Sequence, residues 1–441
     1  MSTSMNRFFA TILLSSVICP ASVYASQLIW DGGNRAVISI VPSNTTGLAE
    51  ICVAYGMEGR SVSFPASSAA DVKWYRYSNL GAGFAEEISG AVFADGLSTL
   101  TTVEGDMGYV VETGGRQYCF WVVDYLRHPF SVTSITESSE RDCDFTRLDV
   151  DGTGAEIPYY GVNGRRFILD REISLAYRTL VPDVENMTFV ETRREVSLES
   201  LDNPLRVEGV FCPTDFVITG DRFLREWNDA VEYTSPVIQP YSVSAITSAA
   251  QTERENDNEV NPGSGDASFG GSAPCEVSFE AAVTDGALFR EWQLSRFEDF
   301  DVINLSFQDL KFDYTFTEEG TTYVRFVCAN SDGSCEYHGD IYTVSVGASS
   351  LKCPNAFSPN GDGINDEWKV SYSGIISFEC TIFDRYGHKM ISFSDPSQGW
   401  DGKHNGKNVP SGAYYYVIKA RGADGKDYKL SGDINIVNYS K

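Results

Sequence analysis

The chain has 441 residues, of which 42% are hydrophobic and 13% aromatic, so it can bury several cores and should divide into about three or four domains. Sixty-one acidic residues against 34 basic ones give a formal charge of −27. That charge excludes nucleic acid as an expected partner, because its phosphates would be repelled. We also expect no transmembrane segment, since no uninterrupted apolar run of about 18 residues follows the amino-terminal region.

The amino terminus has the layout of a secretory signal peptide. Arg7 precedes an apolar run over residues 8–18, and a cleavage-site pattern with small residues follows at Val23-Tyr-Ala25. We therefore predict a cleaved signal peptide at residues 1–25 and an exported mature chain. Cys19 raises the alternative of a lipoprotein, which the bulky residue before that cysteine disfavours.

Hydrophobic periodicity of two runs through almost all of the mature chain and predicts an all-β protein built from tandem β-sandwiches. For residues 26–137 we predict an immunoglobulin-like sandwich. Cys52, Trp74 and Cys119 stand in the order typical of that fold, in which a disulfide joins the two sheets beneath an indole. We therefore predict a Cys52–Cys119 bridge, as expected in an exported chain with nine mature cysteines.

The segment Lys73-Trp-Tyr-Arg-Tyr77 carries the candidate ligand contact of this first sandwich. Strand alternation sends Trp74 inward and places Tyr75 and Tyr77 together on the other face. Exposed there, the two rings would offer a stacking platform to a carbohydrate. The alternative is that they pair across strands, which is the commoner role of tyrosine on a solvent-facing sheet.

A second immunoglobulin-like β-domain is predicted at residues 138–210. Cys143 and Cys212 each stand shortly before an aromatic residue at the start of a strand-like segment. This weak repeat suggests that the two segments begin related modules. We predict a Cys143–Cys212 bridge between these domain starts. The end of the second domain is left open, because residues 211–251 can instead close it.

The third sandwich is predicted at residues 211–349. Cys275, Trp292 and Cys328 repeat the cysteine, tryptophan, cysteine order, and alternation turns both cysteines inward, so we predict a Cys275–Cys328 bridge. An insertion at residues 252–273 is acidic and rich in glycine and serine, which predicts a solvated flexible loop. Three cysteines are left without an assigned partner: Cys335, Cys353 and Cys380.

Within this third module, residues 314–333 resemble the late strands of a polycystic-kidney-disease-type (PKD) domain. They read Tyr-Thr-Phe-Thr-Glu-Glu-Gly-Thr-Thr-Tyr and continue into a strongly alternating strand. The resemblance implies a β-sandwich of a kind that serves bacterial surface proteins as a spacer or adhesive module. It leaves the ligand open.

Residues 350–441 hold the most specific motifs of the chain. Pro354-Asn-Ala-Phe-Ser-Pro-Asn-Gly-Asp-Gly-Ile-Asn-Asp366 is followed in order by Ile382-Phe-Asp-Arg-Tyr-Gly387, Gly399-Trp-Asp-Gly402 and Val409-Pro-Ser-Gly-Ala-Tyr-Tyr-Tyr416. The segment resembles the gliding-motility-associated C-terminal domain, which is the type B sorting domain of the Bacteroidota type IX secretion system. The resemblance implies a β-sandwich recognised by the secretion machinery, with these sorting-motif residues: Asn360, Gly361, Asp362, Gly363, Asn365 and Asp366.

The same loop is the stronger of two candidate cation sites in the sequence, the other being the shorter cluster Asp149-Val-Asp-Gly152. Asn360, Asp362 and Asp366 place oxygen atoms near the alternation that wraps a calcium ion. Ile364 stands where a further ligand belongs, so we favour an ordered turn in which the Asn and Asp side chains bond backbone amides.

We expect no enzyme activity, because the four histidines lie in turn-like surroundings and no nucleophile elbow such as GxSxG occurs. The sequence thus predicts an exported, modular, non-enzymatic protein, at the cell surface or outside the cell, with an adhesive or scaffolding role. If the type IX route is absent, the protein would stay periplasmic. Its expected partners are the secretion machinery, through the last domain, and surface proteins or glycans. The alternative is a glycan-binding surface protein that serves polysaccharide uptake.

Overall fold

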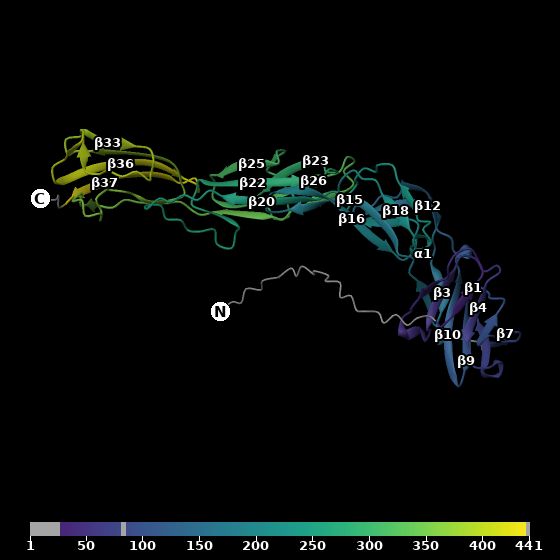
Figure 1. Ribbon diagram of the computed structural model, residues 1–441. Helices are drawn as coiled ribbons and strands as arrows, with labels where there is room; N and C mark the ends of the chain where they lie inside the picture. The colour runs from purple at the N-terminus through teal and green to yellow at the C-terminus, as the bar shows by residue number, and fades with distance from the viewer. Residues whose placement is uncertain (1–26, 81–84, 438–441) are drawn as a thin grey trace.

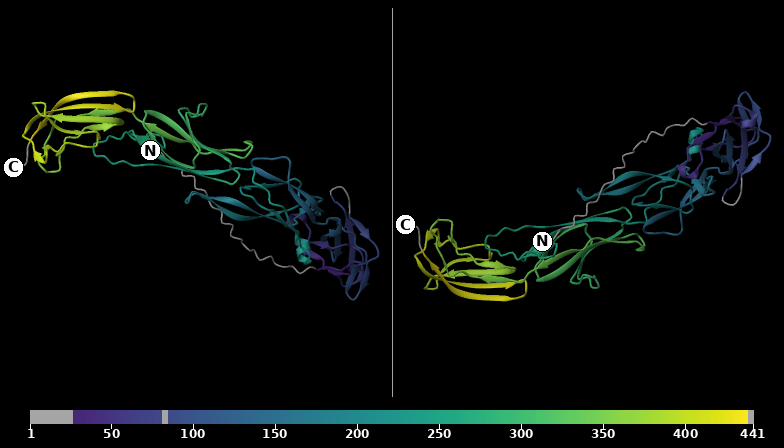
Figure 2. Two further views of the ribbon diagram at one scale, coloured as in Figure 1. Left: turned by 90° about the horizontal axis from the view of Figure 1, so that it is seen from above. Right: turned by 90° about the horizontal axis from the view of Figure 1, so that it is seen from below.

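A computed structural model describes residues 27–80 and 85–437, and the predicted signal peptide lies outside these residues. The described chain is all-β, as predicted, and its one α-helix is the five-residue α1 (Arg222–Glu226). Four sandwich-like modules follow one another, and the first stands at an angle to the row formed by the other three (Figures 1 and 2). None of the helices in the described part is long and apolar enough to cross a membrane.

The first module packs two sheets face to face. The smaller sheet has the order β1-β4-β8-β7, with bounds β1 (Ile29–Asp31), β4 (Ser61–Pro65), β8 (Leu97–Leu100) and β7 (Val92–Ala94). The larger sheet has the order β2-β3-β10-β9-β5-β6, with bounds β2 (Ile38–Ile40), β3 (Glu50–Ala54), β10 (Arg116–Asp124), β9 (Met107–Thr113), β5 (Val72–Tyr77) and β6 (Glu86–Ile88). Short 3₁₀ turns lie at Asn44–Thr46, Ala69–Asp71 and Tyr125–Arg127.

The centre of the larger sheet of the first module, at β3 and β10, is buried on both faces. Phe120 and Val122 point into the core between the two sheets, whereas Trp121 and Val123 point into a second core shared with the next module. This explains why residues 118–123 of β10 form an unbroken apolar run instead of an alternating one, since a strand covered on both sides needs apolar residues on both faces. The first two modules are therefore joined by a continuous hydrophobic core.

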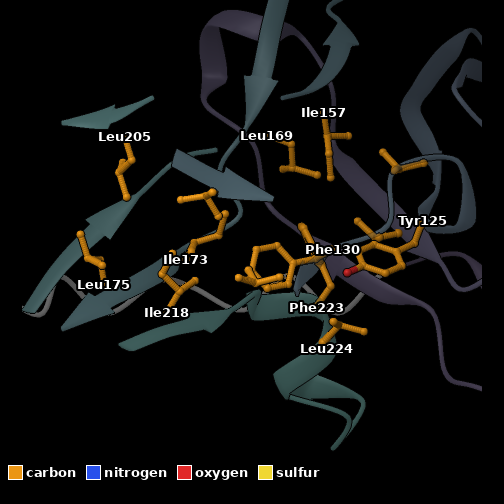
Figure 3. Close-up of a cluster of buried hydrophobic side chains, with 14 of the residues drawn as sticks. Tyr125, Phe130, Ile157, Leu169, Ile173, Leu175, Leu205, Ile218, Phe223 and Leu224 are labelled. Atoms are coloured by element: carbon orange, nitrogen blue, oxygen red, sulfur yellow. The ribbon is translucent and has the colours of Figure 1, made fainter. Parts of the chain in front are cut away.

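The second module is built from three sheets. The first has the order β11-β12-β17, with bounds β11 (Ser131–Glu137), β12 (Phe145–Thr153) and β17 (Leu205–Glu208). The second sheet is the pair β13 (Ile157–Tyr160) and β14 (Arg166–Leu169). The third sheet has the order β16-β15-β18-β19, with bounds β16 (Thr188–Leu198), β15 (Ile173–Asp183), β18 (Val217–Gly220) and β19 (Val231–Thr234). Their inner side chains meet Tyr125 of the first module in the shared core (Figure 3).

Strand pairing shifts the two boundaries predicted for this module. β11 pairs with β12, although the predicted boundary after residue 137 separates them. β18 pairs with β15 and β19 pairs with β18, although the predicted boundary after residue 210 assigns both to the third module. We therefore propose that the second module spans about residues 128–240, which is the alternative that the sequence left open at its carboxyl end.

The third module packs two sheets around Trp292, which is fully buried. One sheet has the order β20-β22-β25, with bounds β20 (Ala245–Gln251), β22 (Cys275–Val283) and β25 (Lys311–Phe316). The other has the order β21-β28-β26-β23-β24 with β27 also on β26, and bounds β21 (Phe269–Gly271), β28 (Tyr342–Val346), β26 (Gly320–Ala329), β23 (Phe289–Ser295), β24 (Leu305–Phe307) and β27 (Glu336–His338). The PKD resemblance of this module stays a prediction.

The fourth module has its own core, centred on Trp368 and Trp400, both fully buried. Its main sheet has the order β30-β37-β36-β32-β33, with bounds β30 (Ala356–Phe357), β37 (Asp427–Ile436), β36 (Gly412–Gly422), β32 (Ile375–Phe383) and β33 (Lys389–Phe393). Two small pairs complete it: β29 (Ser350–Lys352) with β31 (Ser371–Ser373), and β34 (Lys403–His404) with β35 (Lys407–Asn408).

The predicted Cys52–Cys119 bridge is wrong, because both cysteines are free. In the parallel pairing of β3 with β10, Cys52 stands opposite Val122 and shares its face of the sheet. Cys119 is three residues from Val122, an odd number, so its side chain points to the opposite face. Accordingly, Cys52 lies in the core between the two sheets and Cys119 lies against the shared core.

The predicted Cys275–Cys328 bridge is also absent, although both cysteines point into the core of the third module as predicted. Cys275 is the first residue of β22, whereas Cys328 stands next to Ala329, whose carbonyl accepts the amide of Leu288 in the turn after β22. The two cysteines therefore occupy opposite ends of the sandwich. Strand alternation correctly predicted which face each cysteine is on. It carries no information on how far along the sandwich each cysteine lies.

The Cys143–Cys212 bridge is wrong as well, because Cys143 bonds Cys335 in the third module, 192 residues away. Cys212 is 2% exposed and turned inward between β17 and β18. Cys143 lies on the loop before β12, where it meets the loop that joins β26 to β27. The bridge thus ties the second module to the third.

Candidate secretion-signal site

The loop of residues 360–366 is folded around the carboxylate of Asp366. One carboxylate oxygen accepts the backbone amide of Gly361 at 2.6 Å and the other accepts that of Gly363 at 2.7 Å. These two hydrogen bonds to the charged form, that from Gly361 first, hold the pKa of Asp366 below its ordinary value. Asp366 is therefore the residue that fixes the backbone of the predicted sorting motif.

Two further side chains of the motif close local turns. The Asn360 side-chain oxygen accepts the amide of Asp362 at 3.0 Å, and the Asp362 carboxylate accepts the amide of Ile364 at 2.8 Å. Asn365 adopts a left-handed conformation with φ of 53°, and its carbonyl accepts the amide of Ser358 at 2.8 Å. The geometry is the ordered turn favoured from the sequence, while calcium binding by Asn360, Asp362 and Asp366 stays a prediction.

We expect the hydrogen bonds of Asp366 to depend on pH in one direction. A carboxyl group whose pKa is lowered by folding stabilises the loop at neutral pH, and this contribution is lost as the pH falls below the ordinary value of 3.8 and through the lowered pKa. The amide proton shifts of Gly361 and Gly363, followed by NMR, should therefore change together below that pH. In Asp366→Asn the change should vanish; a step that persists in this variant would contradict the assignment.

Two tryptophans anchor the loop to the core of the fourth module. Trp368 and Trp400 exchange backbone hydrogen bonds of 2.9 and 3.0 Å, and the Trp368 indole donates to the carbonyl of Pro354 at 2.7 Å. The Trp400 indole donates to the carbonyl of Lys403 at 2.9 Å. The motif residues around 354–368 and 399–402 thus form one hydrogen-bonded unit, which explains why the sequence carries both.

The acidic insertion at residues 252–273, predicted as a flexible loop, instead docks on the fourth module, and we call its part 256–260 the strap. The amide of Val260 donates to the carbonyl of Tyr372 at 2.7 Å, and the amide of Tyr372 donates to the carbonyl of Asn258 at 3.1 Å. These bonds form an isolated parallel bridge between Glu259 and Tyr372, which holds the strap alongside β31 in the manner of strand addition. The composition of the insertion could not predict this docking, because the backbone that the strap bonds, at Tyr372, lies more than a hundred residues away in the chain.

Side chains of the strap reinforce the docking. The Asn258 side-chain amide donates to the carbonyls of Val370 and Pro396, both at 2.8 Å, and Asp257 forms an ion pair of 2.9 Å with Lys369. A groove of about 670 Å³ runs between the strap and the sorting-motif loop, with Asp257 on one side and Asp366 on the other. The strap and the motif are therefore neighbours in space.

The carbohydrate platform predicted at Tyr75 and Tyr77 does not exist in the structure. Trp74 points inward as predicted, but Tyr77 is only 3% exposed and its hydroxyl donates to the carbonyl of Tyr160 in the second module. Tyr75 is half-buried against the same shared core. The alternation was correct, whereas the assumption that the other face is open was wrong.

The histidines have structural partners. His128 and His388 each contact a carboxylate, at 3.1 Å from Asp106 and 2.9 Å from Asp384. His338 lies 3.3 Å from the carboxylate of Glu336, and His404 contacts the carbonyl of Met390 at 2.8 Å. These contacts fix turns and strand ends in place.

Two parts of the chain match known domain families. Residues 134–235 match the fibronectin type III domain, and residues 351–436 match the CHU_C Type IX secretion signal domain. Neither description is that of an enzyme family. No protein among the curated sequences matches the chain.

Among solved structures, the chain is similar to dimeric latent PorU from Porphyromonas gingivalis, with 10% identity and a TM-score of 0.15 over 73% of this chain. It spans only 35% of the length of that protein. A biofilm-associated protein BSP domain has 10% identity and a TM-score of 0.18, covering 94% of this chain and 96% of its own. A Ca²⁺-stabilised ice-binding adhesin from an Antarctic bacterium has 12% identity and a TM-score of 0.19, covering 92% and 99%.

The family matches agree with the pairing described above. The fibronectin type III match ends at residue 235, directly after β19, which supports assigning β18 and β19 to the second module. The secretion-signal match begins within β29 and ends with β37, so it covers the whole fourth sandwich. The chain therefore carries a fibronectin type III domain at residues 134–235 and, at residues 351–436, a type IX secretion signal domain that directs export to the cell surface or the extracellular space.

Proposed function

We propose that this protein is a non-enzymatic surface or secreted rod, in which the secretion signal domain delivers three preceding modules that act in adhesion or as a scaffold. The observation that carries the proposal is that every junction between modules is reinforced by specific contacts. Modules that only needed to be exported could be joined by loose linkers, which is the default expectation for neighbouring domains. A protein that holds a surface at a set distance from its point of attachment needs stiff junctions.

Each junction is held by a different kind of contact. The first and second modules share a hydrophobic core, in which the hydroxyl of Tyr125 from the first module donates at 3.2 Å to Asp221 of the second. Asp221 is in turn paired with the buried Arg171 of its own module at 2.7 Å. The second and third are joined by the Cys143–Cys335 disulfide. The third and fourth are joined by the strap, and also by a backbone hydrogen bond of 3.0 Å from the amide of Glu319 to the carbonyl of Ala423. The elongated arrangement in Figures 1 and 2 follows from these contacts.

The delivery role is tested by removing residues 350–441 in the native bacterium. We expect the full chain in the medium or accessible to protease on intact cells, and the shortened chain in the periplasm. The Cys143–Cys335 bridge lies entirely in the retained part, so its mobility shift on a non-reducing gel shows that the shortened chain has folded. A shortened chain that is bridged and still reaches the surface would refute the delivery role.

A further inference from the structure

A hollow of about 280 Å³ lies at the outer end of the secretion signal domain. Its walls are formed by Asp384, Arg385, Tyr386, Met390, His404 and residues 409–414. β36 begins in this wall at Gly412 and runs to Gly422, beside the contact with the third module, so the hollow is at the far end of the sheet. In Figure 1 this is the end of the molecule near β33. A hollow of this size accepts one large side chain, and it is smaller than the usual site for a small-molecule ligand.

The loop at the rim of the hollow is held rigidly from within. One carboxylate oxygen of Asp384 accepts the amides of Tyr386 and His388, both at 2.8 Å, and the other contacts the His388 ring at 2.9 Å. Tyr386 is thereby left 71% exposed, with the Arg385 guanidinium 4.9 Å from its ring centre. On the opposite wall, the Tyr414 hydroxyl donates to the carbonyl of Pro410 at 2.9 Å.

An exposed tyrosine beside an arginine on a preformed loop contributes little to the fold of the domain itself. Tyrosine and arginine are the side chains that most often dominate the energy of protein interfaces, especially next to a pocket that takes a partner side chain. The rigid Asp384 turn lowers the entropy cost of binding, because neither side chain has to be ordered by a large loop movement. The outer end therefore has the properties of a binding surface.

Charge defines the partner. Residues 351–436 contain ten acidic and ten basic side chains, so the net charge of −27 resides on the rest of the chain. At the hollow the balance is locally positive: the Asp384 carboxylate is engaged by its own loop, while Arg385, Lys389 and Lys407 are exposed around it. Lys389 precedes Met390 in the wall, and Lys407 pairs with His404 in the β34–β35 hairpin. An acidic partner is attracted here and repelled by the other modules.

The opposite end and one sheet edge of the domain are already occupied. The strap covers β31 through Tyr372, and the carbonyl of Gly374 accepts the amide of Ala423, which in turn contacts Glu319 of the third module. A secretion component that approaches the folded protein finds these sides covered. Within the described part of the chain, the hollow at the outer end is left open.

We propose that the secretion machinery binds this outer end, and that the occupant is a segment of a machinery protein with a carboxylate for Arg385 and an apolar or aromatic side chain for the hollow. The proposal rests on the delivery role proposed above. It places recognition at Arg385 and Tyr386, whereas the motif loop of residues 360–366 supports the domain from the side that faces the strap.

The test uses the full chain in the native bacterium with Arg385→Glu or Tyr386→Ala. Loss of one dominant interface contact of about 1.4 kcal/mol lowers affinity tenfold, so we expect the protease-accessible fraction on intact cells to fall by about tenfold. Arg421→Glu is the matched control, because Arg421 is an exposed arginine of the same domain on β36, at the end next to the third module. It should be delivered normally. Tyr386→Phe, which keeps the ring, should also be delivered.

Purified variants should melt within about 2 °C of the parent protein, since the altered side chains are exposed. If Arg385→Glu melts earlier, Arg385→Gln removes the charge without reversing it and replaces it in the comparison. Normal delivery of both Arg385→Glu and Tyr386→Ala would overturn the proposal, as would equal damage from Arg421→Glu. These results differ from failure of the delivery role, in which the chain without residues 350–441 itself reaches the surface.

Discussion

Replacing Asp221 with alanine is expected to destabilise the junction of the first two modules by about 3–5 kcal/mol. Asp221 and Arg171 are 0% and 1% exposed, and their side chains are 2.7 Å apart. Asp221 also accepts the hydroxyl of Tyr125, at 3.2 Å, and the amide of Leu224 at the start of α1, at 3.1 Å. Removal of the carboxylate leaves a buried guanidinium without its counter-charge, and this unpaired charge is the main cost.

Urea unfolding followed by tryptophan fluorescence measures the effect. Glu191→Ala is the control, because Glu191 forms an ion pair with Arg178 in which the two side chains are 55% and 45% exposed, so its loss should cost less than about 1 kcal/mol. The double change Arg171→Met with Asp221→Leu should recover much of the loss, since it removes both charges together. Equal effects of Asp221→Ala and Glu191→Ala would show that the buried pair does not hold the junction.

Breaking the Cys143–Cys335 disulfide is expected to lower the free energy of unfolding by up to about 5 kcal/mol in the chain-entropy model, because the bridge closes a loop of 192 residues. Contacts around it should persist in part: the Arg141 guanidinium lies 4.9 Å from the Tyr241 ring centre, and the Tyr241 hydroxyl bonds Ser334. The second and third modules should therefore stay folded while their mutual orientation loosens.

Calorimetry of Cys335→Ser against the parent protein, with and without reductant, tests this expectation. Cys353→Ser is the matched control, since Cys353 is free and half-buried and its loss removes a thiol but no bridge. Reductant should lower the unfolding temperature of the parent protein and of Cys353→Ser, but leave that of Cys335→Ser unchanged. An unfolding temperature of the parent protein that does not respond to reductant would contradict the role of the bridge.

The sequence predicted what depends on local pattern. Strand alternation placed Trp74, Cys275 and Cys328 in cores, and the Asn and Asp residues of the 360–366 loop predicted its backbone-bonded turns. The motif order in residues 354–416 led to the secretion signal domain, and the family match confirms it.

What the sequence did not predict depends on which surfaces meet. The face that carries Tyr77 was expected to be open, and the buried Arg171–Asp221 pair was not foreseen, because both depend on the second module covering the first. Cys52 and Cys119 failed to pair because of the register of two strands that are far apart in sequence. The apolar run over residues 118–123 of β10 was the one available signal, since a strand segment without polar positions predicts cover on both faces.

The strap limits how this signal domain can be used as a tag. Residues 350–441 transplanted alone onto a passenger protein would leave the β31 edge around Tyr372 without the backbone partners that Asn258 and Val260 supply. Open sheet edges invite pairing between molecules, so such a fusion would be prone to aggregate. The strap lies in the insertion between β20 and β21, inside the third module. The smallest portable unit is therefore the third and fourth modules together, from about residue 241 onward.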